Sequence, residues 1–119
     1  MITSVAKTFT GNGTNYIGSR IRGRIHAVKV VADANVTNSF DIALTGETTE
    51  VPMLVDASVA NDATTWFYPR AIPNKRADGT SFTDAAVDIY VLNERIKCVT
   101  ALAGTTGIIT VTVFYDSEP

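Results

Sequence analysis

The chain has 119 residues and a formal net charge of −2, and 45% of its residues are hydrophobic. This length and composition are typical of one globular domain and exclude a disordered chain. The single cysteine excludes an internal disulfide, and no apolar run approaches the length of a membrane span. Thr, Val and Ile supply 40 of the residues. Because these β-branched types favour strands, the composition predicts one all-β domain over residues 1–119.

Positive charge is concentrated at the start of the sequence. Residues 1–32 contain five Lys and Arg residues and no Asp or Glu, which leaves a charge of −7 for the remainder. Such segregation favours association with another protein over general nucleic-acid binding, for which the whole domain is usually basic. The opening residues also lack the charged region and long apolar run of a signal peptide.

The first predicted strand spans residues 2–10, where Val5 and Phe9 alternate with small polar residues. The strand ends at Gly11-Asn12-Gly13, because these residue types tolerate the positive φ of tight turns. We interpret residues 1–12 as an N-terminal arm or an edge strand that is able to add to a neighbour's sheet.

The next strand contains the most distinctive segment of the chain, residues 20–32, with the sequence RIRGRIHAVKVVA. Alternate residues of a strand share a face. Arg20, Arg22, Arg24 and His26 therefore point to one side, and the residues between them point to the other. This pattern predicts a strand with one apolar face and one strongly basic face.

Two details of this strand concern its backbone. Gly23 inside the strand indicates a bulge or a close approach of another backbone segment. A bulge would also explain why the apolar parity becomes ambiguous near Val28. Residues 28–31 are nearly all apolar, which predicts that both faces of the strand are buried there.

Two strands are predicted in the middle of the chain. Residues 39–45 alternate between apolar and polar types, as in a half-buried strand. Residues 51–55 form a short apolar strand, and Pro52 favours an edge position because proline cannot donate to a strand ladder. Residues 56–63 are small and polar and predict a loop or a single helical turn.

The aromatic run Trp66-Phe67-Tyr68 has two interpretations. In a strand, Trp66 and Tyr68 share one face and Phe67 takes the other, which is how aromatic side chains fill the core of a two-sheet fold. Alternatively, the run forms a platform on which sugars or bases stack. We favour the core interpretation, because aromatic residues so often anchor β-sheet cores.

The rest of the chain adds a long connection and three strands. Residues 71–85 form a connection whose length is often associated with function. The later elements are a strand at 86–92, a tight turn at Asn93-Glu94, a strand at 95–102, a hairpin turn at Gly104–Gly107 and a closing strand at 108–115. About eight antiparallel strands without helical periodicity predict a β-sandwich or jelly roll. The predicted core residues, each costing about 2–4 kcal/mol when truncated to Ala, are Ile25, Phe40, Ile42, Leu44, Ile89, Val91, Ile96, Val111 and Val113.

The sequence does not contain a recognisable catalytic set. A serine or cysteine nucleophile needs a base, and the only histidine is His26. Cys98 falls on an apolar face beside Ile96 and Leu102, which predicts a buried and inert thiol. A zinc site needs about four ligands, whereas the chain has two Cys or His residues. We therefore predict no catalytic residue, no metal and no cofactor, and a hydrolase based on His26 and loop acids such as Asp78, Asp84 and Asp88 is a weak alternative.

The arginine stripe has three interpretations, namely a solvated sheet face, a phosphate-binding surface and a protein interface. The acidic balance of the remaining chain argues against phosphate. Arginine is enriched in protein interfaces and pairs bidentately with carboxylates, which supports the third interpretation. The candidate interface residues are Arg20, Arg22, Arg24, Lys29, Lys7, Arg70, Lys75 and Arg76.

Several segments resemble, in order and spacing, those of small virion proteins of tailed bacteriophages. These segments are Arg22 to Ile25, Phe40 to Glu47, Tyr68-Pro69-Arg70, Asn93 to Val99 and Ala103 to Gly107. The chain is similar in this respect to jelly-roll capsid decoration, or cement, proteins.

The resemblance implies a function and a location. It implies a dimer or trimer on the outside of the virion capsid that clamps major capsid subunits, with synthesis in the cytoplasm of a bacterial host. No nucleic acid and no membrane is expected as a partner. The alternatives are another virion position, such as the tail or the base of a head fibre, and a carbohydrate-binding module that uses Trp66 and Tyr68.

Overall fold

The computed structural model describes residues 1–70 and 87–117 of the chain. These residues form seven strands and no helix, so the predicted all-β class is confirmed. The strands are β1 (Ile2–Thr10), β2 (Gly13–Ala32), β3 (Phe40–Gly46), β4 (Pro52–Val59), β5 (Thr64–Phe67), β6 (Tyr90–Ala101) and β7 (Ile108–Ser117).

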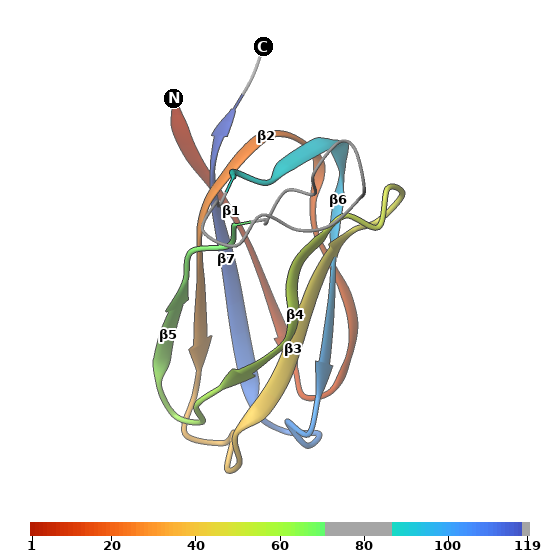
Figure 1. The fold of residues 1–119 in the computed structure, drawn as a ribbon. Helices are drawn as coiled ribbons and strands as arrows, with labels where there is room; N and C mark the ends of the chain where they lie inside the picture. The colour runs from red at the N-terminus through yellow and green to blue at the C-terminus, as the bar shows by residue number, and fades with distance from the viewer. Residues whose placement is uncertain (71–86, 118–119) are drawn as a thin grey trace, which may run out of the picture.

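The long strand β2 belongs to both layers of a β-sandwich. Its first half, from Gly13 to Arg24, pairs with β6, whereas residues 23–32 pair with β7 and residues 28–31 also pair with β5. One layer therefore has the order β1-β7-β2-β5 and the other has the order β2-β6-β3-β4. All of these pairs are antiparallel, and Figure 1 shows β2 arching over one end of the sandwich between the layers. The predicted sandwich architecture is confirmed.

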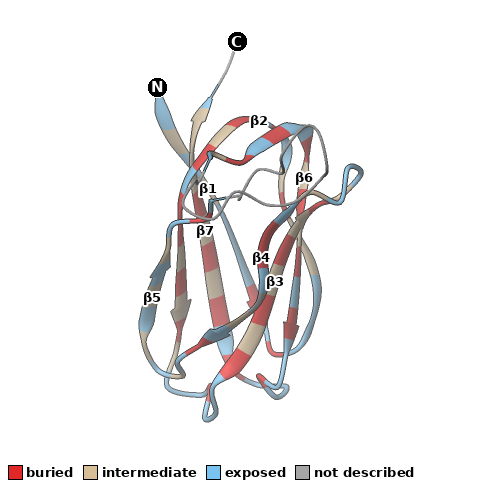
Figure 2. Ribbon diagram, in the orientation of Figure 1, coloured by how far each residue is buried: buried red, intermediate tan, exposed pale blue. Residues whose placement is uncertain are grey.

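The core lies between the two layers and is made of residues that are coloured as buried in Figure 2. All nine residues predicted to form it are buried, with between 0% and 4% of their surface exposed. The regular alternation of β3, in which Phe40, Ile42 and Leu44 point inward, is one example. Hydrophobic periodicity therefore located the core correctly.

The bulge predicted in β2 lies at His26 instead of Gly23. Ile25 pairs with Tyr115 and Ala27 pairs with Phe114, so His26 is an extra residue in the ladder. The parity of burial changes just after this point, because Ala27 and Val28 are both buried. Gly23 instead provides the close approach, since its φ is 150° and a Cβ atom there would collide with the carbonyl oxygen of Asp116.

The expectation that residues 28–31 are buried on both faces is wrong. Val28 and Val30 are fully buried, but Lys29 and Val31 are only half-buried. Lys29 pairs with Thr112 on one side and with Trp66 on the other, so these residues belong to the outer face of the layer. An apolar run can therefore occur where only one face of a strand is covered.

Three predicted boundaries in the second half of the chain are also wrong. β4 continues to Val59, which pairs with Phe40, where a loop was predicted from residue 56. The predicted turn at Asn93-Glu94 is a bulge inside the continuous strand β6, because Asn93 adopts a φ of 60° as the extra residue between Leu92 and Glu94. Leu102 is 66% exposed instead of buried, since its φ of 72° ends the inward alternation.

Among the described residues, the free edges of the layers are β1, β4, β5 and the first half of β2, whose residues 13–22 pair with β6 alone. β4 is the last strand of its layer, as Pro52 predicted. β1 is the last strand of the other layer and pairs with β7 of the same chain over its whole length. The segment at 71–85, predicted to be a functional connection, lies outside the described residues.

Candidate protein interface

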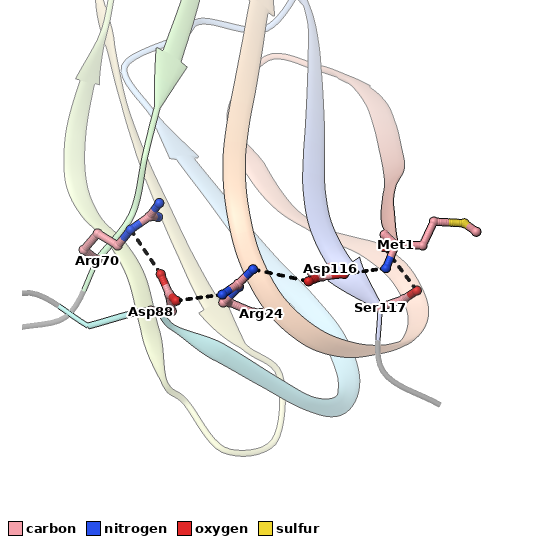
Figure 3. Close-up of polar contacts among 6 residues, drawn as sticks. All are labelled: Met1, Arg24, Arg70, Asp88, Asp116 and Ser117. Atoms are coloured by element: carbon pink, nitrogen blue, oxygen red, sulfur yellow. Dashed lines mark hydrogen bonds and ion pairs between the residues drawn. The ribbon is translucent and has the colours of Figure 1, made fainter.

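A line of alternating charges crosses one end of the sandwich (Figure 3). Arg24 on β2 contacts the Asp88 carboxylate at 3.3 Å and the Asp116 carboxylate of β7 at 3.2 Å. Asp88 in turn lies 3.3 Å from the guanidinium Nε of Arg70, and Asp116 lies 2.6 Å from the terminal amine of Met1. The line therefore joins segments from both ends and the middle of the chain.

This line divides the predicted arginine stripe into two parts. Arg24 is held between two carboxylates, and the pKa of the Asp116 carboxyl is lowered, chiefly by the hydrogen bond from the terminal amine and its charge. Arg20 and Arg22 lie on the same strand and are exposed. Neither forms a salt bridge with the residues that the structure describes. The charge available to a partner is therefore concentrated at Arg20 and Arg22.

Exposed apolar side chains stand next to these arginines. Arg22 pairs with Leu92 of β6, and Arg24 pairs with Tyr90, and directly paired residues share a sheet face. Leu92 is 65% exposed and Tyr90 is 48% exposed. We call this surface, made of Arg20, Arg22, Arg24, Tyr90 and Leu92, the basic face. Arginine beside exposed tyrosine and leucine resembles the composition of protein interfaces, where tyrosine and arginine are the commonest anchors.

The aromatic run lies on the opposite layer, and the core interpretation is wrong for two of its residues. Phe67 packs against the core, but Trp66 is 46% exposed and Tyr68 is 64% exposed. Because the sandwich has only two layers, β5 has one face toward the core, where Phe67 packs, and one face away from it. Trp66 stacks on Phe114 with ring centroids 5.6 Å apart, and the Lys29 ammonium lies 5.6 Å from the Trp66 ring.

The remaining candidate residues are separated from the basic face. Lys29 belongs to the outer face of the β5 layer, and Lys7 lies on the edge strand β1. Lys75 and Arg76 lie outside the described residues, as do the loop acids Asp78 and Asp84. The structure thus brings Arg20, Arg22 and Arg24 together and places Arg70 near them through Asp88.

The two side chains considered for nucleophilic chemistry lie in different layers, His26 where β2 pairs with β7 and Cys98 on β6. His26 is exposed at the bulge of β2, whereas Cys98 is fully buried in the core, as predicted. Burial raises the pKa of the Cys98 thiol to about 12, which leaves it protonated at neutral pH. Among the described residues, no three His, Cys, Asp or Glu side chains are grouped so that they could hold a metal ion.

The most important polar residue that the sequence interpretation missed is Glu94. It is only 6% exposed, and its carboxylate accepts hydrogen bonds from the Thr48 and Thr49 amides at 2.7 and 3.1 Å and from the Thr49 hydroxyl at 2.8 Å. The signal was present, because Glu94 shares the inward parity of Ile96 and Cys98. These hydrogen bonds from the β3–β4 turn to Glu94 hold the turn against β6, next to the basic face.

Comparison with known proteins gives no family. The chain matches no protein-family model, and no curated protein sequence shows significant similarity to it. The described residues also contain no helix that could cross a membrane.

Proposed function

We propose that this protein is a bacteriophage capsid decoration protein that binds an acidic surface of the major capsid protein through its basic face. The proposal assigns no catalytic step, and it places the protein on the outside of the virion after synthesis in the bacterial cytoplasm. Copies of the chain would act as dimers or trimers that clamp neighbouring capsid subunits. The ordered sequence resemblance to decoration proteins supports this role.

The observation that carries the proposal is the exposure of Arg20 and Arg22 beside Leu92 and Tyr90. Arginines pair bidentately with carboxylates, and apolar side chains next to them exclude water from such pairs. The ion pair between Arg24 and Asp116 joins the middle of β2 to the end of β7, so the basic face is presented on a fixed backbone. A preorganised face loses little conformational entropy when it binds.

Binding to undecorated capsids tests the proposal. We expect saturable co-sedimentation of the wild-type protein and a rise in the temperature at which the capsids disrupt. The double variant R20E/R22E should bind roughly tenfold or more weakly, because like charges at an interface are strongly unfavourable. The single variant R22E is compared with K29E, which makes the same charge change on the outer face of the other layer.

The outcomes separate the possible conclusions. Thermal denaturation of the isolated variants checks that all of them fold as the wild type does. Absence of saturable binding by the wild type contradicts the decoration function, whereas equal losses in R22E and K29E contradict the assignment of the basic face. Electron microscopy of the complex distinguishes the capsid exterior from the tail or a head fibre.

Carbohydrate binding is a second candidate, and the exposure of Trp66 and Tyr68 favours it. Exposed aromatic rings on a sheet face are able to stack against sugar rings as they do against other planar groups. Titration with a panel of polysaccharides, followed by tryptophan fluorescence, tests this function directly because Trp66 is the only tryptophan. An unchanged spectrum across the panel would eliminate this candidate.

A further inference from the structure

The free edge of β1 has the features of a self-association surface. β1 is nine residues long and pairs with β7 from Ile2–Asp116 to Thr10–Ile108 without a register shift. No strand among the described residues lies along its other edge. A long and regular free edge presents unpaired backbone groups to which a second chain is able to add a strand.

One residue of β1 breaks the apolar pattern of its inner face. Val5 and Phe9 pair with the buried residues Val113 and Ile109, and both face the core. Lys7 stands between them and pairs with Val111, which is fully buried. Directly paired residues share a face, so Lys7 occupies an inward position and is nevertheless exposed.

An inward lysine opposes pairing of this edge with another copy of the chain. Adding a strand beside β1 would extend the layer and cover the inner face at its present edge. β1 contains no carboxylate that could replace the water lost by the Lys7 ammonium, and such a loss is costly. In a two-fold antiparallel pair, both copies would bring a lysine to the same inner face, and the like charges would repel each other.

The other free edges carry different obstacles to strand addition. The first half of β2 shifts register against β6 between Ile17 and Ile21. β4 begins with Pro52, and its pairing with β3 shifts register between Ile42 and Leu44. β5 has only four residues. Proline, bulges, short strands and inward charges are the means by which natural proteins protect sheet edges. β1 is the most regular of these edges because its pairing has no register shift, and the inward charge of Lys7 is its protection.

We propose that the β1 edge is a latent surface for pairing with β1 of a second copy, and that Lys7 keeps this surface closed. The charge of one side chain then decides whether two sandwiches join into a continuous sheet. This inference does not depend on the decoration function, because it concerns the edge of the other layer from the one that carries Tyr90 and Leu92. Any oligomer formed by the wild-type chain would use a different surface.

Two apolar substitutions on adjacent residues of β1 test the proposal. K7I removes the inward charge, and A6I places the same side chain on the outer face of the same strand, where Ala6 is exposed. Sedimentation velocity of the full chain over a range of concentrations gives the mass of each species. We expect K7I to sediment at twice the wild-type mass or more, while A6I and K7E remain at the wild-type mass.

Circular dichroism of each variant checks that the fold is retained. If folded K7I keeps the wild-type mass at every concentration, the proposal is wrong. It is equally wrong if A6I associates as strongly as K7I, because general surface hydrophobicity would then account for the association. The K7E variant extends the test, since a charge of either sign should keep the edge closed.

Discussion

Replacement of Glu94 by glutamine tests whether a buried carboxylate stabilises the β3–β4 turn. E94Q keeps the size of the side chain and an oxygen that accepts the two amide hydrogen bonds, but it removes the charge. A hydrogen bond to a charged group contributes about 1.5–3 kcal/mol, against about 0.5–1.5 kcal/mol for a neutral pair. Three such bonds are weakened, and the lower desolvation cost of glutamine offsets part of the loss. We expect E94Q to be less stable by roughly 2 kcal/mol at pH 7.

The pH dependence of this difference follows from the pKa of Glu94. Burial raises that pKa, but the amides of Thr49 and Thr48 and the Thr49 hydroxyl lower it by more, and Glu47 raises it slightly. The net result is a pKa below the ordinary value of 4.5. At pH values between the folded and unfolded pKa of Glu94, the unfolded chain binds more protons than the folded chain, so stability rises with pH in this interval. The stabilisation by the charged Glu94 carboxylate is therefore complete above the unfolded pKa. It is lost as the pH falls through the folded pKa.

Urea denaturation of the wild type and E94Q between pH 7 and pH 3.5 measures this effect. Apart from the neighbouring Glu47, which interacts with Glu94, the other acids are common to both proteins, so the difference in the free energy of unfolding reports chiefly on Glu94. We expect that difference to be constant near neutral pH and to shrink below pH 4.5. E50Q changes an exposed glutamate of the same turn and should follow the wild type throughout. A gap between wild type and E94Q that is the same at all pH values would refute the reasoning.

Two further predictions concern β2 and the core. G23A should be less stable than G13A by roughly 1–3 kcal/mol in chemical denaturation. Both glycines have φ near 150°, but only a Cβ atom at Gly23 would collide with the Asp116 carbonyl oxygen. Equal losses of stability in the two variants would show that this close approach is unimportant. Cys98 should not react with a thiol reagent in the native state, because its thiol is buried and its pKa is raised to about 12. The urea-unfolded protein should react at once. Rapid labelling of the native protein would contradict this prediction.

The alternation of apolar and polar residues predicted the strands and their inward faces better than it predicted where strands end or bulge. Alternation in residues 39–45 and 108–115 identified inward residues correctly, because each strand has one covered face. The same rule failed at Leu102, where a single positive φ ends the alternation and the residue type gives no turn signal. Asn93 is of a type that tolerates positive φ, but the sequence did not distinguish the predicted turn from the bulge that the structure contains. Backbone conformation there is set by the register of neighbouring strands, which the sequence does not display.

The aromatic run failed for a different reason. A strand pattern assigns residues to two faces, but it does not state whether each face is covered. Trp66 and Phe67 are both large aromatic residues, and their burial differs because Phe67 points between the layers while Trp66 points outward. Which face of β5 points inward follows from its pairing with β2 over a long separation in sequence.

The positive charge at the start of the sequence is partly paired with acidic residues in the folded protein. Residues 1–32 contain five Lys and Arg residues and no Asp or Glu, yet antiparallel pairing places Asp116 directly opposite Arg24. Asp88 approaches the same guanidinium from the start of β6 and also holds Arg70. Two of the predicted interface arginines therefore stabilise the end of the sandwich. Because carboxylates already surround Arg24, an acidic partner gains more from Arg20 and Arg22, and specificity should depend on these two residues and their apolar neighbours.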